Sequence, residues 1–389
     1  MIGSISKIRP CGHHHHYYKY AHSKNRADLK RVCSNTQNYM DDQVETVWGP
    51  FSLDGITAAY DAGEVGLFPD TRMTKFVANM PNCTALNHAF HYWNIHSKNL
   101  KEVDLGDIKW ENVTSIARGF SDVGLTKFPE GINLLSDSCN IGWSFANAVR
   151  YILTSNNNVI PYNERINTHK SLGGIFAYQF NDGAWFYTHF ELDENYTFEN
   201  AEDISYFIQN GWPYVDIGLS KTPPRLSFKN LVKADSAFYG NMCLTTFQTV
   251  DNMDKLENGR NMLGRCPKLS SLYPDYESFS LKSLSNAYLM FDECILDKSS
   301  IIKLSNALPD WSGDATEHKI TIGCHIDYKY DPDVNVALKQ LDSNYTTPIE
   351  EYGSSLPTAI SSFKEWTITV QWNGTKTSNA YPEPSQSEE

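Results

Sequence analysis

The phrase Ile116-Ala-Arg-Gly-Phe120 decides the fold, because short phrases of the same kind, each ending in a large apolar residue, recur through most of the chain. We call the last residue of each phrase an anchor. The anchors are Tyr60, Phe90, Phe120, Phe145, Phe176, Phe207, Phe238, Leu263 and Phe291, and they are separated by 30, 30, 25, 31, 31, 31, 25 and 28 residues. A sustained period of about 29 residues indicates a repeat architecture.

Other apolar positions keep phase with the anchors. Four residues before an anchor lie Leu86, Ile116, Ile141 and Leu172, a spacing that puts two apolar groups on one side of a helical turn. An apolar-x-x-apolar pattern follows several anchors, at residues 125–128, 212–215, 244–247 and 269–272. The sequence therefore predicts one short helical turn and one strand in each repeat.

A unit of this size cannot enclose a core by itself, so neighbouring units must cover each other's apolar faces. We expect an α/β fold: a right-handed solenoid with a parallel β-sheet along one face, short helical turns on the other and the anchors in an internal column. The alternative is accidental spacing in a chain with 19 Phe and 22 Tyr. Nine consecutive anchors with matching phrases on both sides argue against it.

Three phrases carry a family resemblance: Trp110-Glu-Asn-Val-Thr-Ser-Ile-Ala-Arg-Gly-Phe120, Ser236-Ala-Phe-Tyr-Gly-Asn-Met-Cys-Leu244 and Asn261-Met-Leu-Gly-Arg-Cys-Pro-Lys-Leu269. They resemble the leucine-rich repeats of the BspA or Treponema type, a bacterial surface-protein family. The stretches 300–310, 319–323 and 364–374 are similar to the closing repeats of such proteins from gut Bacteroidetes and their phages. The resemblance covers roughly residues 50–375 and is weak from 150 to 225. It implies adhesion or protein binding, with no cofactor or catalytic residue to carry over.

Charge and composition divide the chain into four parts. We expect a basic N-terminal arm at 1–48, about nine repeats at 49–310, capping repeats at 311–375 and a flexible acidic tail at 376–389. The first 40 residues carry a net charge of +6, which leaves −19 for the rest of a chain whose total is −13. The cations predicted to anchor the arm are Lys7, Arg9, Lys19, Lys24, Arg26, Lys30 and Arg31. An acidic body repels nucleic acid, so other proteins are the expected partners of the arm.

Targeting signals are not apparent in the sequence. No apolar stretch reaches the roughly 20 residues that cross a bilayer, and the N-terminus has no signal-peptide pattern. We therefore expect the eight cysteines to be free thiols, with Cys266 and Cys294 in a slot that requires only a small apolar residue. The tract from His13 to His16 is interpreted as a flexible polar segment rather than a metal site.

Binding is predicted on the strand face. Because side chains alternate across a sheet, one set of residues should project outward: Glu102, Asp104, Lys127, Phe186, Tyr214, Asp216, Thr246 and Gln248. Exposed aromatics among carboxylates suit a protein or glycan surface, and the alternative is that these positions are merely solvated. No catalytic motif occurs in a fitting context, so we expect no enzyme, cofactor or metal, although an enzyme acting on host glycans is a third hypothesis.

These observations lead to one expectation of function and one alternative. The first is a bacteriophage virion structural protein (a fibre, tail or capsid-decoration component) present in several copies, with the arm inserted among other virion proteins and the body facing a host-surface protein or glycan. It explains a surface-type repeat without an export signal, since phages leave the cytoplasm by lysis. The alternative is an adhesin-like protein on the bacterial cell surface.

Overall fold

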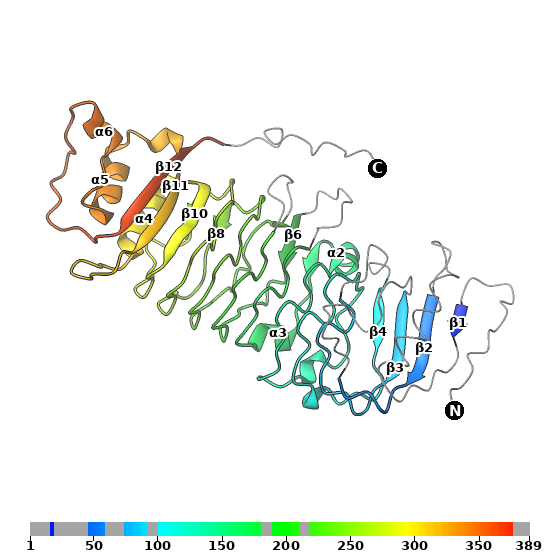
Figure 1. Ribbon diagram of the computed structural model, residues 1–389. Helices are drawn as coiled ribbons and strands as arrows, with labels where there is room; N and C mark the ends of the chain where they lie inside the picture. The colour runs from blue at the N-terminus through cyan, green and yellow to red at the C-terminus, as the bar shows by residue number, and fades with distance from the viewer. Residues whose placement is uncertain are drawn as a thin grey trace, which may run out of the picture. The chain divides into compact units, whose positions relative to one another are not determined.

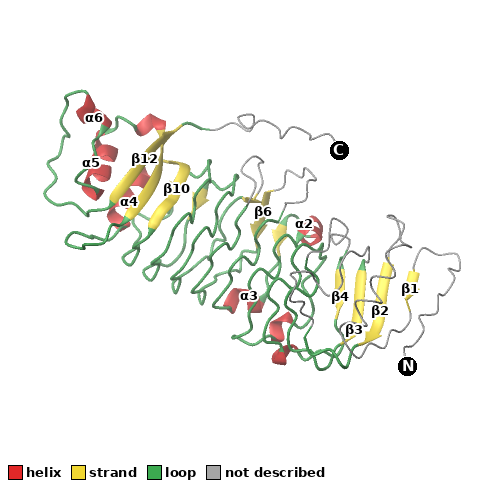
Figure 2. Cartoon of the chain, in the orientation of Figure 1, coloured by secondary structure: helices red, strands yellow, loops and turns green. Residues whose placement is uncertain are grey.

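The computed structural model describes residues 16–18, 46–58, 74–91, 100–179, 189–210 and 218–375. The chain forms two compact units, Met1–Ile166 with Ser171–Ala184, and Asn167–Lys170 with Trp185–Glu389. Both belong to a mixed α/β structure with parallel strands in small sheets and few helices (Figures 1 and 2). Among the residues described, no helix has the length and apolar character needed to cross a bilayer.

The first unit contains a four-stranded parallel sheet in the order β1 (His16–Tyr18), β2 (Thr46–Ser52), β3 (Lys75–Asn79) and β4 (Glu102–Asp104). Val47 pairs with Lys75, and Lys75 pairs with Glu102, so each strand lies beside the strand one coil later. Two segments of the predicted arm, in β1 and β2, therefore belong to the sheet. The unit continues with η3 (Trp110–Asn112), η4 (Ile132–Leu134), α2 (Arg150–Ser155) and β5 (Val159–Ile160), and α3 (Glu164–Thr168) follows in the chain.

A second set of hydrogen bonds joins successive coils at the anchor phrases. Isolated parallel bridges link Ala58, Ala85, Ser115 and Asn140 in the first unit, and Asp203, Lys233, Asn258 and Asn286 in the second. From each bridge, alternate N–H groups donate to the next coil: Leu86 to the Ser115 carbonyl at 2.9 Å and Phe90 to the Gly119 carbonyl at 2.8 Å. This inter-coil ladder satisfies the backbone of a segment that is neither a long strand nor a helix.

The prediction of helical turns at these phrases is wrong. His88, Arg118 and Trp143, each three residues after a bridge, have φ of 53°, 53° and 58°, in the left-handed region. Their N–H groups donate to the following coil at 2.8–3.0 Å rather than to a carbonyl four residues earlier. The apolar pair at i and i+4 therefore comes from a hydrogen-bonded turn, and the spacing alone did not distinguish it from a helical turn.

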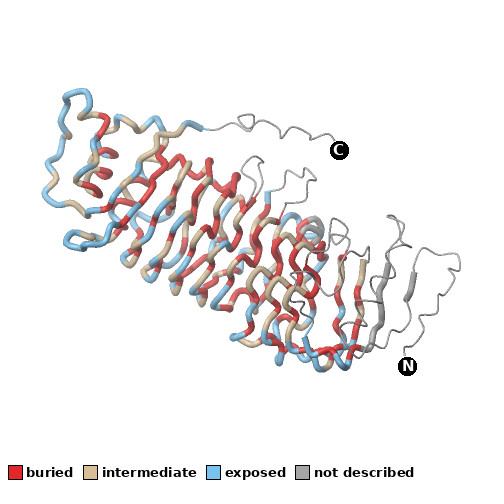
Figure 3. The backbone as a smooth tube through the Cα atoms, viewed as in Figure 1, coloured by how far each residue is buried: buried red, intermediate tan, exposed pale blue. Residues whose placement is uncertain are grey.

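The predicted aromatic column is confirmed in the first unit. Phe90, Phe120 and Phe145 are at most 1% exposed, and consecutive rings stack at centroid distances of 5.7 Å with interplanar angles of 17° and 8°. Phe76 of β3 meets Phe90 edge-on at 5.3 Å. Figure 3 shows the buried positions recurring from coil to coil. Stacking of neighbouring coils thus encloses a core that no single coil encloses.

One anchor of the second unit was misplaced by one residue. The N–H of Ile208 donates to the Ala237 carbonyl at 2.8 Å, as the N–H of Phe238 donates to the Met262 carbonyl at 2.8 Å. Ile208 therefore occupies the anchor slot, with Ile204 four residues before it. Phe207 is buried beside it and meets Phe238 edge-on at 6.0 Å. Aromatic spacing favours Phe207 because it is the larger of the two neighbours.

The second unit has its strands in pairs and in one three-stranded sheet. β6 (His189–Leu192) pairs with β7 (Gly218–Leu219), and β8 (Thr246–Phe247) pairs with β9 (Ser271–Leu272), all in parallel. β8 and β9 confirm the last two residues of two predicted strand phrases. In the first unit, residues 125–128 form no strand, since Pro129 has no N–H and restricts the residue before it. The phrase at 212–215 lies outside the described residues.

The C-terminal sheet is parallel, in the order β10 (Ala287–Leu296), β11 (Lys319–His325) and β12 (Thr367–Asn373). With it lie α4 (Lys298–Ala307), η5 (Ile326–Tyr328), α5 (Pro332–Leu341) and α6 (Pro348–Glu351). α5 and β12 both lie within the predicted capping segment at 311–375. Lys364 donates to the Ser305 and Leu308 carbonyls at 2.7 and 2.6 Å, which satisfies the C-terminal end of α4.

Candidate binding site

A surface depression of about 310 Å³ in the first unit contains three of the residues predicted to bind. It is formed by β4, η3, η4 and the segments beside them. Its lining residues are Glu102, Val103, Asp104, Leu105, Gly106, Ile108, Trp110, Lys127, Glu130, Gly131 and Leu134. The structure thus brings Glu102, Asp104 and Lys127 together, although they come from two successive coils. Asp104 and Lys127 are exposed and Glu102 is half-exposed, as expected of outward positions.

An aromatic side chain and a glycine define one wall of this depression. Trp110 is 7% exposed, and a Cβ atom at Gly131 would lie 2.2 Å from its Cδ1 atom. Gly131 also has φ of +87°, a conformation that L side chains rarely adopt. Only glycine therefore allows the indole to lie against this backbone. At the rim, Leu134 is 60% exposed and offers apolar surface.

Charged groups around the depression are paired but leave an excess of carboxylates. Lys127 Nζ lies 3.1 Å from Glu130 Oε1, and Lys75 Nζ lies 3.0 Å from Glu102 Oε1. The hydrogen bond and charge of Glu130, with the charges of Glu102 and Asp104, raise the pKa of Lys127. Asp104 Oδ1 accepts the Gly106 N–H at 2.9 Å, which fixes that carboxylate at the end of β4. The depression therefore presents fixed acceptors, one ammonium group and an apolar wall.

The remaining predicted residues have other surroundings. Thr246 and Gln248 belong to the second unit, and the Gln248 side chain donates to Asp275 Oδ2 at 2.9 Å and accepts the Asp275 N–H at 3.0 Å. That exchange of two hydrogen bonds is a structural role. Phe186, Tyr214 and Asp216 lie outside the described residues, as do all seven cations predicted to anchor the arm.

Sequence reasoning missed Trp110, Glu130, Gly131 and Leu134. Trp110 opens one of the repeat phrases. The sequence does not distinguish an aromatic residue that is buried as part of the repeat from one that also forms the wall of a binding site. Gly131 and Leu134 follow Pro129 in a segment that carries no repeat position. Their contribution depends on η4 lying beside η3, and no spacing in the sequence indicates that contact.

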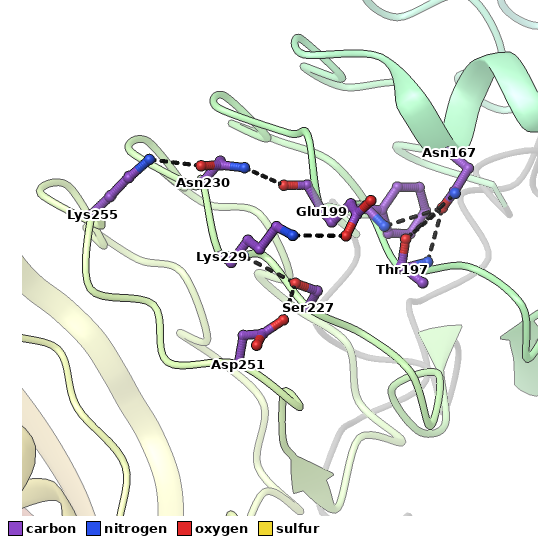
Figure 4. A network of polar contacts seen from close by, with 9 residues as sticks. Asn167, Thr197, Glu199, Ser227, Lys229, Asn230, Asp251 and Lys255 are labelled. Atoms are coloured by element: carbon purple, nitrogen blue, oxygen red, sulfur yellow. Dashed lines mark hydrogen bonds and ion pairs between the residues drawn. The ribbon is translucent and has the colours of Figure 1, made fainter.

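Polar side chains elsewhere connect coils rather than form a cavity. In the second unit, Lys229 Nζ lies 3.0 Å from Glu199 Oε2, and Lys255 Nζ donates to Asn230 Oδ1 at 2.7 Å (Figure 4). Ser227 donates to Asp251 Oδ2 at 2.6 Å. Each of these pairs joins residues 24–30 positions apart, about one coil. We interpret this surface as solvated structural pairing, because exposed ion pairs contribute little to stability.

The cysteine slot is more demanding than predicted. Cys266 donates to the Phe238 carbonyl at 3.3 Å, and Cys294 donates to the Leu263 carbonyl at 3.2 Å. Other coils place an amide in this slot, three residues after the anchor, and it bonds the preceding anchor's carbonyl in the same way. Gln179 Nε2 donates to Phe145 at 2.7 Å, and Asn241 Nδ2 donates to Ile208 at 2.9 Å. In these four coils the slot therefore holds a side chain that donates a hydrogen bond, not merely a small apolar group.

The cysteines that the structure describes are buried. Cys266, Cys294 and Cys324 are free thiols, as predicted. Burial raises the pKa of Cys139 to about 11 and that of Cys266 to about 12. Such thiols are poor nucleophiles near neutral pH. Within the same described ranges, no group of three or more His, Cys, Asp or Glu side chains converges on a common point.

Comparisons with known proteins identify no relative. A scan against protein-family models found no matching family, and searches of curated proteins and of solved structures found no similar protein.

Proposed function

We propose that this chain is a leucine-rich-repeat solenoid of right-handed coil that binds a host-surface protein or glycan, without catalysis, through the depression beside Trp110. One observation carries the proposal. Glu102, Asp104 and Lys127, which strand alternation alone predicts to face outward, gather in one cavity against an aromatic wall. Binding pockets combine apolar walls with a few convergent polar groups in this way.

The size and chemistry of the depression suit one sugar ring or one long side chain. Its volume of about 310 Å³ lies at the lower end of the range for small-ligand sites. Fixed carboxylates accept hydrogen bonds from hydroxyl or ammonium groups, while Lys127 donates. The exposed Leu134 adds apolar contact at the rim.

The experiment is a binding screen of the purified full chain on a glycan array and on a panel of bacterial envelope preparations. The double variant Lys127→Ala, Leu134→Ser removes an exposed donor and an exposed apolar group, so the fold should survive. We expect it to lose at least about tenfold in affinity, which corresponds to about 1.4 kcal/mol. The matched control is Lys282→Ala, which removes an exposed, ion-paired lysine of the second unit. Equal binding by both variants would reject the site.

The setting that we propose is a bacteriophage particle, in several copies, with residues 1–48 contacting other virion proteins. Its support is the resemblance to repeats found in gut Bacteroidetes and their phages, together with the basic arm on an acidic body. A cell-surface adhesin is the second candidate, supported by the same repeat type. Mass spectrometry of purified particles and of cell fractions separates them: the native chain should accompany the particles, and recovery only from the outer-membrane fraction would favour the adhesin.

A further inference from the structure

Two histidines of the first unit lie with their Nδ1 atoms within hydrogen-bond distance of each other. His88 and His91 lie in one coil, and their Nδ1 atoms are 2.8 Å apart. Their ring centroids are 5.0 Å apart and the planes are tilted by 41°. His91 is buried at 2% exposure and His88 is half-buried. The pair is separate from the depression beside Trp110.

The next coils hold the buried ring in place. His91 Nε2 lies 3.3 Å from Asp122 Oδ2, and Asp122 also accepts from Asn147 Nδ2 and Ser121 Oγ, each at 3.1 Å. A carboxylate that binds the outer nitrogen of a histidine fixes the ring's tautomer and orientation, as it does around protein-bound metals.

The inter-coil ladder holds the backbone of the other histidine, His88. His88 has φ of 53°, and its N–H donates to the Ala117 carbonyl of the next coil at 3.0 Å. Arg118 occupies the equivalent slot of that next coil, with the same φ and with its N–H donating to the Gly142 carbonyl at 3.0 Å. The left-handed backbone is thus a property of the repeat. Its consequence in this coil is that residues 88 and 91 face each other.

We infer that His88 and His91 chelate a divalent copper or nickel ion through their two Nδ1 atoms, with Asp122 as the orienting carboxylate and water completing the coordination. At metal–imidazole distances of about 2.0–2.1 Å, nitrogens 2.8 Å apart subtend an angle of about 86° at the metal. That angle matches neighbouring positions of a square-planar or tetragonal ion and is too small for tetrahedral zinc. Imidazole ligands and the order of divalent affinities both favour copper.

The test uses the full chain with His13 to His16 replaced by glutamine, because that tract binds transition metals itself. Cu²⁺ is titrated in competition with a chelator of known affinity, and the loaded protein is examined by electron paramagnetic resonance. We expect one tightly bound Cu²⁺ whose spectrum shows coupling to two equatorial imidazole nitrogens. His88→Asn should lose one nitrogen and weaken binding by at least about tenfold, and asparagine tolerates the left-handed backbone.

Two further variants distinguish chelation from a simple hydrogen bond between the rings. Asp122→Asn should keep both nitrogens but weaken Cu²⁺ binding by about 10- to 100-fold. Arg118→Asn changes the same backbone slot in the next coil and should leave Cu²⁺ binding unaltered. Unchanged affinity and spectrum in His88→Asn, or no spectrum with two nitrogens in the parent protein, would overturn the assignment. Circular dichroism melts identify any variant that has lost its fold.

Discussion

Replacement of Phe120 tests the stacked core most directly. Phe120 is fully buried, and its ring stacks on Phe90 and on Phe145 at 5.7 Å on each side. Truncation of a buried phenylalanine to alanine costs about 3–5 kcal/mol, and each aromatic pair adds about 0.5–1.5 kcal/mol beyond its buried area. Because two pairs are lost at once, we expect Phe120→Ala to cost about 4–5 kcal/mol, near the upper end of that range. Phe120→Leu keeps most of the volume and should cost about 1–2 kcal/mol.

The assay is urea unfolding of the full chain, followed by circular dichroism, with native-state hydrogen exchange to locate the loss. In exchange, the amides of Phe90 and Phe120, which donate to the next coil, should lose protection first. Leu134→Ala is the control, since a leucine that is 60% exposed should change stability by less than about 0.5 kcal/mol. If Phe120→Ala and Leu134→Ala destabilised the protein equally, the stacked column would not be the source of stability.

Three further substitutions probe single features. Gly131→Ala should cost about 1–3 kcal/mol in urea unfolding, because it combines a positive φ with a clash against Trp110. Asp331→Ala should cost about 0.5–2 kcal/mol, since Asp331 caps α5 by accepting the Val334 N–H at 3.0 Å. Cys266→Ala should cost about 0.5–1.5 kcal/mol, since the Phe238 carbonyl loses one donor but still accepts from Asn241 Nδ2 at 2.7 Å. The native thiol should resist aromatic disulfide reagents at pH 8, because burial raises its pKa to about 12.

The Asp331 prediction has a definite pH dependence. Burial tends to raise the pKa of Asp331, but the Val334 N–H and the Lys298 ammonium outweigh it and lower the pKa below its usual value. A lowered native pKa means that the unfolded chain binds more protons, so this contribution is complete above about pH 4 and is lost as the pH falls further. The stability difference between wild type and Asp331→Ala should shrink below pH 4. A stability difference that stayed constant down to pH 2 would contradict the capping role of Asp331. Rapid labelling of the Cys266 thiol in the native protein would contradict the prediction for Cys266. A Gly131→Ala variant as stable as the wild type would contradict the predicted clash with Trp110.

The spacing of the sequence predicted the features that depend on the repeat length, such as the aromatic column. It did not predict the features that depend on backbone conformation, such as the turns at the anchor phrases. Phe90, Phe120 and Phe145 were identified as one column because their spacing reports the length of a coil. Ile208 was missed because aromatic size, not hydrogen-bond register, defined the anchor. The helical turns were wrong because a pair at i and i+4 is also produced by a turn whose N–H groups bond the next coil. Three of the eleven residues that line the depression were predicted, Glu102 and Asp104 in β4 and Lys127 in a segment that forms no strand. The wall of Trp110, Gly131 and Leu134 depends on a contact between η3 and η4 that lies outside the repeat.

The repeat separates stability from recognition within one chain. Anchor residues such as Phe120 are enclosed on both sides by neighbouring coils, so they have no surface with which to bind anything. The two candidate sites relate to the ladder differently. Trp110 and Lys127 at the depression lie in segments outside it, whereas His88 and Asp122 donate their own N–H groups to the next coil. At the histidine pair the ladder therefore fixes the backbone under the side chains. Ligand specificity can therefore change at such positions without loss of the core, while the rigid backbone reduces the ordering cost of binding.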